Sequence, residues 1–196
     1  MWKFITSALE PDSWLKIDPV QTLVCFWGRS NVGKSSLLNS ITNQNISYVS
    51  KHPGRTQLIN YFGDINDKLI VDLPGYGFAK MSKEKQIKMN KYIDKFLENN
   101  DNKYIFLLID SRTGITKIDL EKINYLEKIN WPVDIIYTKI DKLNQKEKSQ
   151  LIKKHNELFS KNLISNITNF FFVSSQKNIN LNELVKHIDK ILYNEH

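Results

Sequence analysis

The chain has 196 residues, of which 41% are hydrophobic and 25% are charged, the balance of an ordinary soluble globular protein. Its formal net charge of +7 is a weak indication of an anionic partner such as nucleic acid. With one cysteine, no apolar run near the ~18 residues of a membrane span and no clear secretory signal, the sequence predicts a cytoplasmic protein that contacts no membrane.

The chain begins with a segment that shows no clear helical or strand pattern, and a predicted strand and a glycine-rich loop follow it. Residues 1–20 predict an N-terminal arm that packs or frays, and we expect one domain over residues 21–196. The run QTLVCFW at 21–27 predicts a buried strand that leads directly into GRSNVGKSS at 28–36. This loop fits G-x-x-x-x-G-K-[ST], and apolar residues at helical spacing follow it. Strand, loop and helix in this order predict a phosphate-binding loop.

Each residue type in this loop has a chemical reason. Gly28 and Gly33 allow the backbone to turn tightly and to approach phosphate oxygens. The ammonium of Lys34 suits the β- and γ-phosphates, and the Ser35 hydroxyl suits Mg²⁺. The alternative, a serine-rich turn before a helix, does not account for the preceding strand.

A hairpin and a second phosphate-site candidate come next. Two short strands around Asn66 and Asp67 predict a hairpin that ends in VDLPGYG at 71–77. A carboxylate at a strand end, here Asp72, can hold Mg²⁺ through water, and the N–H of Gly75 can meet a γ-phosphate. Alone, DLPG could be any turn, but its position after a phosphate-binding loop favours the nucleotide site.

The rest of the chain alternates strands with helices. The apolar runs at 104–110, 133–138 and 170–173 predict strands that are covered on both faces. Helical stripes of apolar residues occur at 89–97, 123–129, 151–159 and 181–192. The pattern predicts an α/β fold of three layers, with a mostly parallel sheet of about six strands, one antiparallel edge strand and helices on both faces.

The segment TKID at 138–141 indicates which base is bound. Asp141 can accept hydrogen bonds from N1–H and the 2-amino group of guanine, whereas adenine offers neither donor on that edge. The stem of Lys139 can lie along the base. VSSQK at 173–177 ends the last strand, and its amides could meet the guanine carbonyl, although this motif is weak by itself.

These stretches together resemble a known family. GRSNVGKSSLLN, HPGRTQLINYF, DLPGYGFAK and TKIDK, with SSQK behind them, are similar to the EngB (YsxC/YihA) ribosome-biogenesis GTP-binding proteins of the TRAFAC class, from about residue 23 to 192. The resemblance implies a P-loop GTPase fold, a cycle between GTP and GDP, Mg²⁺, action in large ribosomal subunit assembly, and a need in normal cell division and septation.

The resemblance also implies the site residues. Ser35, Thr56 and Asp72 would hold Mg²⁺, and Asn31, Lys34, Thr56 and Gly75 would serve catalysis. The nucleotide would be surrounded by Gly28, Arg29, Ser30, Asn31, Val32, Gly33, Lys34, Ser35, Ser36, Gly54, Arg55, Thr56, Asp72, Leu73, Pro74, Gly75, Thr138, Lys139, Ile140, Asp141, Val173, Ser174 and Ser175.

Several positions bear on hydrolysis or depart from the pattern. Tyr76 stands where Ras-like proteins place a water-orienting glutamine, so we expect slow intrinsic hydrolysis. Asn31 matches an asparagine that holds K⁺ in related GTPases; K⁺ there is a hypothesis, and the alternative is that Asn31 only stabilises the loop. Arg55 is the arginine best placed to help in cis. Trp27 replaces a small residue before the loop, and Thr138 replaces the asparagine of N-K-x-D.

A lysine-rich face and three rival functions complete the expectations. Lysines cluster on and before the helix at 81–98, as a face either for ribosomal RNA or simply for solvent: Lys80, Lys83, Lys85, Lys88, Lys91 and Lys95. We expect a monomer that binds the large ribosomal subunit and its rRNA, and no DNA. The rivals are an rRNA-binding module whose nucleotide is mainly structural, a membrane-linked GTPase, which lacks support from lipidation motifs, and an ATPase, which Asp141 opposes.

Overall fold

The computed structural model describes residues 1–47, 57–77, 82–99 and 102–193. Its centre is a sheet of seven strands in the order β1-β3-β4-β2-β5-β6-β7. The strands are β1 (Lys3–Ala8), β2 (Leu23–Gly28), β3 (Ile59–Gly63), β4 (Leu69–Asp72), β5 (Lys103–Asp110), β6 (Val133–Thr138) and β7 (Ile167–Phe172). From β4 to β7 across the sheet, every neighbouring pair is parallel. The prediction of a mostly parallel α/β sheet is confirmed.

The edge of the sheet at β1 adds detail that the sequence does not predict. The sequence predicts an arm over residues 1–20 and about six strands, but Lys3–Ala8 pair antiparallel with β3 and add the seventh strand. The strand that runs against its neighbours, β3, is therefore second from the edge and not the edge strand itself. The sequence indicates this strand only weakly, because Ala8 is the only buried residue of β1 and the segment has no apolar run.

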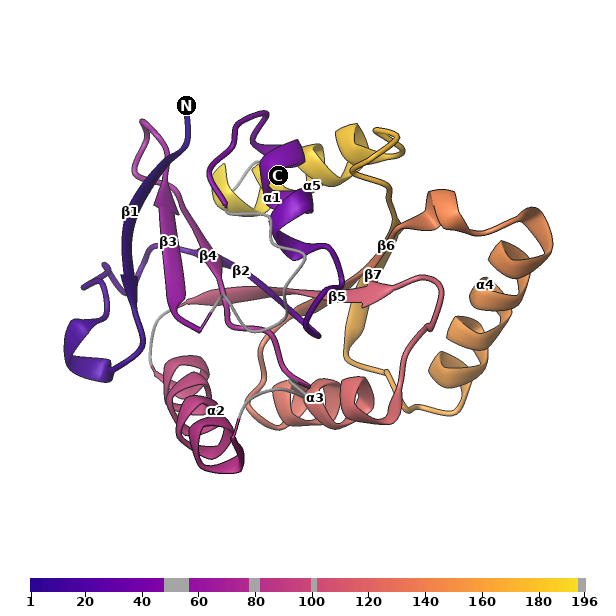
Figure 1. Cartoon of the computed structure of the whole chain (residues 1–196), viewed down its shortest axis with the longest axis horizontal. Helices are drawn as coiled ribbons and strands as arrows, with labels where there is room; N and C mark the ends of the chain where they lie inside the picture. The colour runs from indigo at the N-terminus through magenta and orange to yellow at the C-terminus, as the bar shows by residue number, and fades with distance from the viewer. Residues whose placement is uncertain (48–56, 78–81, 100–101, 194–196) are drawn as a thin grey trace.

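Helices cover both faces of the sheet and make three layers (Figure 1). On one face lie α1 (Lys34–Ile41) and α5 (Leu181–Tyr193), which pack on Val24 and Phe26 of β2. On the other lie α2 (Lys83–Glu98), α3 (Lys117–Lys128) and α4 (Gln145–Ser160), whose apolar residues share a core with Cys25 and Trp27. Alternate side chains of β2 thus enter opposite cores, which explains its unbroken apolar run. Two short 3₁₀ turns span Pro11–Ser13 and Ile140–Lys142.

The topology gathers the motifs at one edge. Because β2, β4, β6 and β7 all point the same way, the loops that follow them meet at the carboxyl end of the sheet. These are the glycine-rich loop, DLPGYG, TKID and VSSQK, the motifs that carry the sequence argument. Among the described residues, no helix combines the length and apolarity needed to cross a bilayer.

Candidate functional site

The glycine-rich loop ends in a helix start that is open to an anion. Gly33 is the N-cap of α1 and has φ of 100°, a left-handed conformation that strains any residue with a Cβ. No side chain among the described residues caps this helix. The N–H groups of its first turn, in Lys34, Ser35 and Ser36, have no partner within the helix, which is the arrangement that binds phosphate.

A buried ion pair lies beside this helix start. The ammonium of Lys34 bonds Oδ1 of Asp72, which is fully buried at the end of β4. The other carboxylate oxygen, Oδ2, is buried and has no hydrogen-bond partner among the described residues. An unpaired buried carboxylate oxygen is costly, so a cation or a hydrogen-bond donor at this oxygen would be stabilising. Asp72 and the Ser35 hydroxyl are oxygen donors of the type that Mg²⁺ prefers, and they fit this ion.

The loop that would bind the base is tied to the phosphate loop. The Thr138 hydroxyl donates to the carbonyl of Val32 at 2.6 Å. Lys139 has a left-handed φ of 59°, and its ammonium donates to the carbonyl of Asn31 at 2.6 Å. The threonine that departs from N-K-x-D therefore still links the two loops, and Ile140 is buried beneath them.

Asp110, which the sequence argument did not single out, organises this junction. Its carboxylate accepts from the Lys139 ammonium at 2.9 Å and from two guanidinium nitrogens of Arg112 at 2.9 and 2.6 Å. Burial alone would raise its pKa, but the hydrogen bonds from Arg112 and Lys139 outweigh burial and lower the pKa to about 2. The sequence could have indicated Asp110 as a candidate site residue, because it ends an apolar strand just as Asp72 does.

The proposed base-reading carboxylate is held in its ionised form. Ser174 donates its hydroxyl to Oδ1 of Asp141 at 2.6 Å, and the Lys142 ammonium lies 3.1 Å from Oδ2. The Ser174 hydrogen bond is the main reason that the pKa of Asp141 is lowered. The Val173 carbonyl accepts a hydrogen bond from the Ile140 N–H at 3.1 Å, so the loops after β6 and β7 are joined. Ser175 directly follows Ser174 in the second of these loops. Asp141 is thus an acceptor at neutral pH, as guanine recognition requires.

The DLPGYG segment lies directly against the phosphate loop. The N–H of Leu73 bonds the carbonyl of Phe26 at 3.0 Å, and the N–H of Tyr76 bonds the carbonyl of Gly28 at 3.1 Å. The Tyr76 side chain is buried, and its hydroxyl donates to Asp119 at 2.8 Å. Burial first, and then the charge of Asp119, raise its pKa. This side chain points into the core, so it does not take the place of a water-orienting glutamine.

The structure brings most of the predicted site together. The predicted residues at 28–36, 72–75, 138–141 and 173–175 lie at the carboxyl ends of β2, β4, β6 and β7 or directly after them, and those at 34–36 form the first turn of α1. Gly54, Arg55 and Thr56 lie outside the described residues, as does Lys80. The side chain of Arg29 donates hydrogen bonds to Asp119 at 3.1 Å and to Thr113 at 2.7 Å. The contact with the nucleotide that the sequence predicts for Arg29 would therefore come from its backbone.

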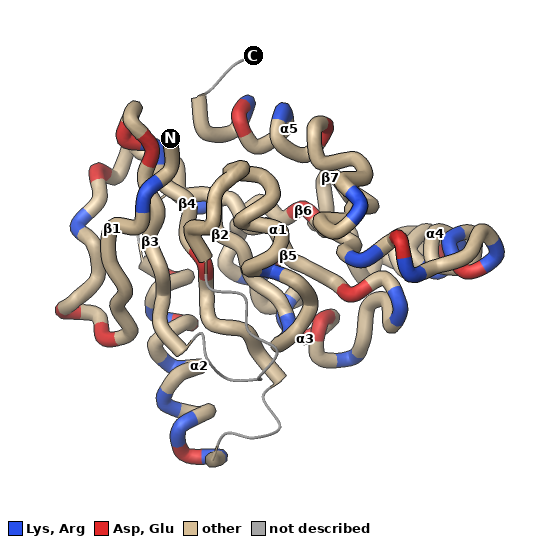
Figure 2. Tube along the Cα trace, turned by 45° about the horizontal axis from the view of Figure 1, so that its top comes forward, with Lys and Arg blue, Asp and Glu red and all other residues tan. Residues whose placement is uncertain are grey.

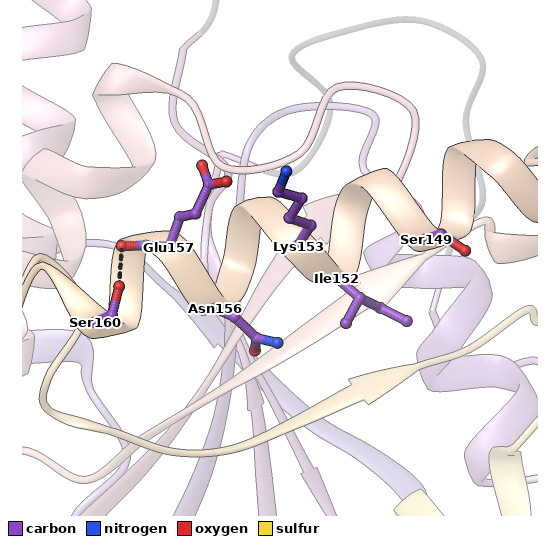
Figure 3. Close-up of a pocket in the computed structure, with 6 residues that line it drawn as sticks. All are labelled: Ser149, Ile152, Lys153, Asn156, Glu157 and Ser160. Carbon is purple, nitrogen blue, oxygen red and sulfur yellow. Dashed lines mark hydrogen bonds between the residues drawn. The ribbon is translucent and has the colours of Figure 1, made fainter.

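A further concave region is separate from this edge. It lies along α4 and is lined by one helix only, as Figure 3 shows: Ser149, Ile152, Lys153, Asn156, Glu157 and Ser160. None of these residues belongs to the four loops of the predicted site. The region therefore gives no competing candidate for the nucleotide.

Known sequences provide an independent test. The sequence pattern of the family described as "50S ribosome-binding GTPase" matches residues 23–139. A "Probable GTP-binding protein EngB" of Mycoplasmopsis agalactiae is 60% identical over 195 residues, which cover 98% of this chain and 99% of that protein. A protein of the same description from Thermotoga maritima is 39% identical and covers 73% of this chain and 74% of its own.

Solved structures agree with these relatives. A crystal structure of "a probable GTP-binding protein engB" superposes with a TM-score of 0.69 at 26% identity, covering 88% of this chain and 100% of that one. Era, solved in complex with MgGDPNP and nucleotides 1506–1542 of 16S ribosomal RNA, gives a TM-score of 0.68 at 29% identity, covering 88% of this chain and 57% of Era.

Proposed function

The chain belongs to the EngB family of P-loop GTP-binding proteins, and from this premise we propose that it hydrolyses GTP and acts as a nucleotide-dependent switch in large ribosomal subunit assembly. The same role would make it necessary for normal cell division and septation. One observation carries the proposal: an uncapped helix start for phosphate and an ionised carboxylate for guanine lie on loops at the same edge of the sheet.

Guanine would be selected by Asp141. Its carboxylate would accept from N1–H and the 2-amino group, while the stem of Lys139 lies along the base. Adenine would leave this carboxylate desolvated and unpaired, which costs at least ~1–3 kcal/mol. The hydrogen bond from Ser174 supports this role because it orients the Asp141 carboxylate and favours its ionised form.

The phosphates and Mg²⁺ would lie at the start of α1. When the β- and γ-phosphates are bound, the Lys34 ammonium would contact them, and Asp72 would be left free for the ion. Ser35, Asp72 and Thr56 would hold Mg²⁺, which neutralises charge on the phosphate oxygens. The orphaned Oδ2 of Asp72 supports this assignment.

Hydrolysis would be slow without further help. The buried position of Tyr76 supports the absence of a glutamine-like water ligand. We propose that Asn31 holds K⁺ beside the phosphates, and that Arg55 assists in cis. At equal ionic strength, turnover should be several-fold faster in KCl than in NaCl. Equal rates in the two salts would contradict the role of K⁺.

The ribosome is the partner that the family description favours. The family is described as "50S ribosome-binding", and Era was solved with a piece of 16S rRNA. The net charge of +7 and the exposed lysines of α2 are suited to phosphate backbones. We propose that the protein works in the cytoplasm as a monomer and contacts rRNA but not DNA.

A second function is an rRNA-binding module in which the nucleotide is mainly structural. Position 76 is a tyrosine and not the water-orienting glutamine of Ras-like proteins. The slow hydrolysis expected from this favours a module in which turnover is incidental. The rate of GTP hydrolysis with and without large ribosomal subunits distinguishes the two functions. If the protein is a switch, the subunits should accelerate hydrolysis. A rate that the subunits leave unchanged would favour the module.

Replacing Asp141 by Asn tests the nucleotide site. The amide offers an N–H where the carboxylate offered only acceptors, so Asp141→Asn should weaken GTP binding by about 10- to 100-fold. Xanthine carries a carbonyl in place of the 2-amino group, so xanthosine triphosphate should bind the variant better than the parent. Unchanged GTP affinity in the variant would contradict the site, while the gain for xanthosine triphosphate excludes misfolding as the cause.

A further inference from the structure

Resting on the proposed function, we propose that Trp27, Tyr76 and Asp119 clamp the backbone on both sides of Gly75. In this clamp they are positioning residues that hold the Gly75 N–H where it meets the γ-phosphate. None of the three belongs to the predicted nucleotide contacts. Their effect would therefore appear in the preference for GTP over GDP, since GDP has no γ-phosphate.

Trp27 holds the residue before Gly75. The indole Nε1 donates to the carbonyl of Pro74 at 3.1 Å, and the whole side chain is buried. Its ring meets the Tyr76 ring edge-on, with centroids 5.2 Å apart and an interplanar angle of 75°. A small residue at position 27 would supply neither contact, so this departure from the family pattern has a structural consequence.

Asp119 holds the residue after Gly75. It is fully buried at the third position of α3, where Oδ2 accepts from the N–H and hydroxyl of Thr116 at 2.8 and 2.7 Å. That capping box needs only this oxygen. The other oxygen, Oδ1, accepts from the Tyr76 hydroxyl at 2.8 Å and from Arg29 Nε at 3.1 Å. Asp119 thus joins DLPGYG, the phosphate loop and α3.

The backbone at Gly75 is closely packed against the phosphate loop. The Ser30 N–H donates to the carbonyl of Tyr76 at 3.0 Å, and the Tyr76 N–H donates to Gly28 at 3.1 Å. A Cβ on Gly75 would lie 3.2 Å from the Gly28 carbonyl oxygen and 3.2 Å from the Ser30 nitrogen, closer than most real Cβ contacts. A shift of Tyr76 therefore moves both the Gly75 amide and the amide of Ser30 in the phosphate loop.

The test compares affinities for GDP and for a non-hydrolysable GTP analogue in the presence of Mg²⁺. Tyr76→Phe removes one hydroxyl and keeps the buried ring, so the ratio of analogue to GDP affinity should fall about three- to tenfold, as for one hydrogen bond. Asp119→Asn and Trp27→Phe should lower the same ratio. The affinity for GDP should change less than the affinity for the analogue, because only the analogue has a γ-phosphate to contact the Gly75 N–H.

Two matched controls separate positioning from general stability. Tyr104→Phe removes a hydrogen bond of the same kind, from Tyr104 to Asp134 at 2.8 Å, and Trp131→Phe removes an indole bond to the Leu97 carbonyl. Thermal unfolding is followed in parallel, and the controls should lose stability without a change in the affinity ratio.

The outcomes distinguish the clamp from the proposed function. A Tyr76→Phe protein that binds GDP and the analogue in the parent's ratio would overturn the clamp alone. An equal ratio change in Tyr104→Phe would also overturn it. A parent that binds neither guanine nucleotide would contradict the proposed function itself, and the clamp with it.

Discussion

At the scale of single residues, two lysines connect the loops of the site. Lys34 reaches from the phosphate loop to Asp72 at the end of β4. Lys139 reaches from the base loop to both Asn31 and Asp110. Each lysine therefore joins two segments that are far apart in sequence and fixes the position of one loop relative to the other.

His155 gives a prediction about pH. Burial lowers its pKa, and Nδ1 of the ring shares a hydrogen bond with the Tyr137 hydroxyl at 2.8 Å. The unfolded chain takes up a proton near the ordinary pKa of 6.5, before the folded protein does, so the free energy of unfolding falls as pH drops below that value.

The variant His155→Gln removes this titration and leaves an acceptor for Tyr137. We expect it to be less stable than the parent at pH 7.5, and the difference should shrink as pH falls to 5. Urea denaturation across this range measures it. Parallel stability curves for the two proteins would contradict the assignment.

The sequence predicts those site residues whose chemistry lies in contiguous motifs. Lys34, Asp72 and Asp141 follow from loop spacing and strand ends alone. Asp110 was missed although it ends an apolar strand, because no known motif includes it. Asp119 was missed because its partners Tyr76 and Arg29 come from other segments, and only the fold brings them together. The inward direction of Tyr76 is likewise a tertiary property.

At the scale of elements, α2 carries the lysine face. Lys88, Lys91 and Lys95 are exposed, while Met89, Ile93, Phe96 and Leu97 of the same helix are buried. Figure 2 shows several basic positions in blue along α2. Ile87 is also exposed on this helix, at 69% of its surface. Lys88 lies 3.5 Å from Glu10, but both side chains are exposed, so this pair is worth little. The face is therefore available to a polyanionic partner.

Charge reversal tests this face. Replacing Lys88, Lys91 and Lys95 by Glu should weaken binding to large ribosomal subunits by about tenfold or more, because contacts to phosphate are lost. GTP affinity should not change, since none of the three belongs to the nucleotide site. Cosedimentation and nucleotide titration measure the two effects.

A matched reversal on another helix provides the control. Lys146, Lys153 and Lys154 are exposed on α4, and their replacement by Glu changes the net charge equally. This control should bind subunits more tightly than the α2 variant. Equal loss in both variants would show that net charge alone, and not the α2 face, governs binding.

Most elements could be predicted from their pattern of apolar residues. The central strands contain long apolar runs, since both of their faces are covered, and α2, α3, α4 and α5 show apolar stripes at helical spacing. Lys3–Ala8 could not be predicted, because an edge strand with only Ala8 buried leaves no pattern. The pairing of this strand with β3 is set by the tertiary fold.

At the scale of the whole molecule, the proposed nucleotide site and the proposed ribosome-binding face follow one another along the chain. The motifs of the proposed nucleotide site lie at the carboxyl edge of the sheet, and α2 is the next described helix after Asp72 and Gly75. Movement of the segment around Gly75 with nucleotide state would couple GTP binding to the affinity for the ribosome.

The most direct test of this account is cosedimentation with purified large ribosomal subunits. The full chain is compared with a non-hydrolysable GTP analogue, with GDP and without nucleotide. The account predicts binding that is at least several-fold tighter with the analogue than with GDP. Binding that is equal in all three states, or absent from all three, would contradict a nucleotide-dependent switch on the ribosome.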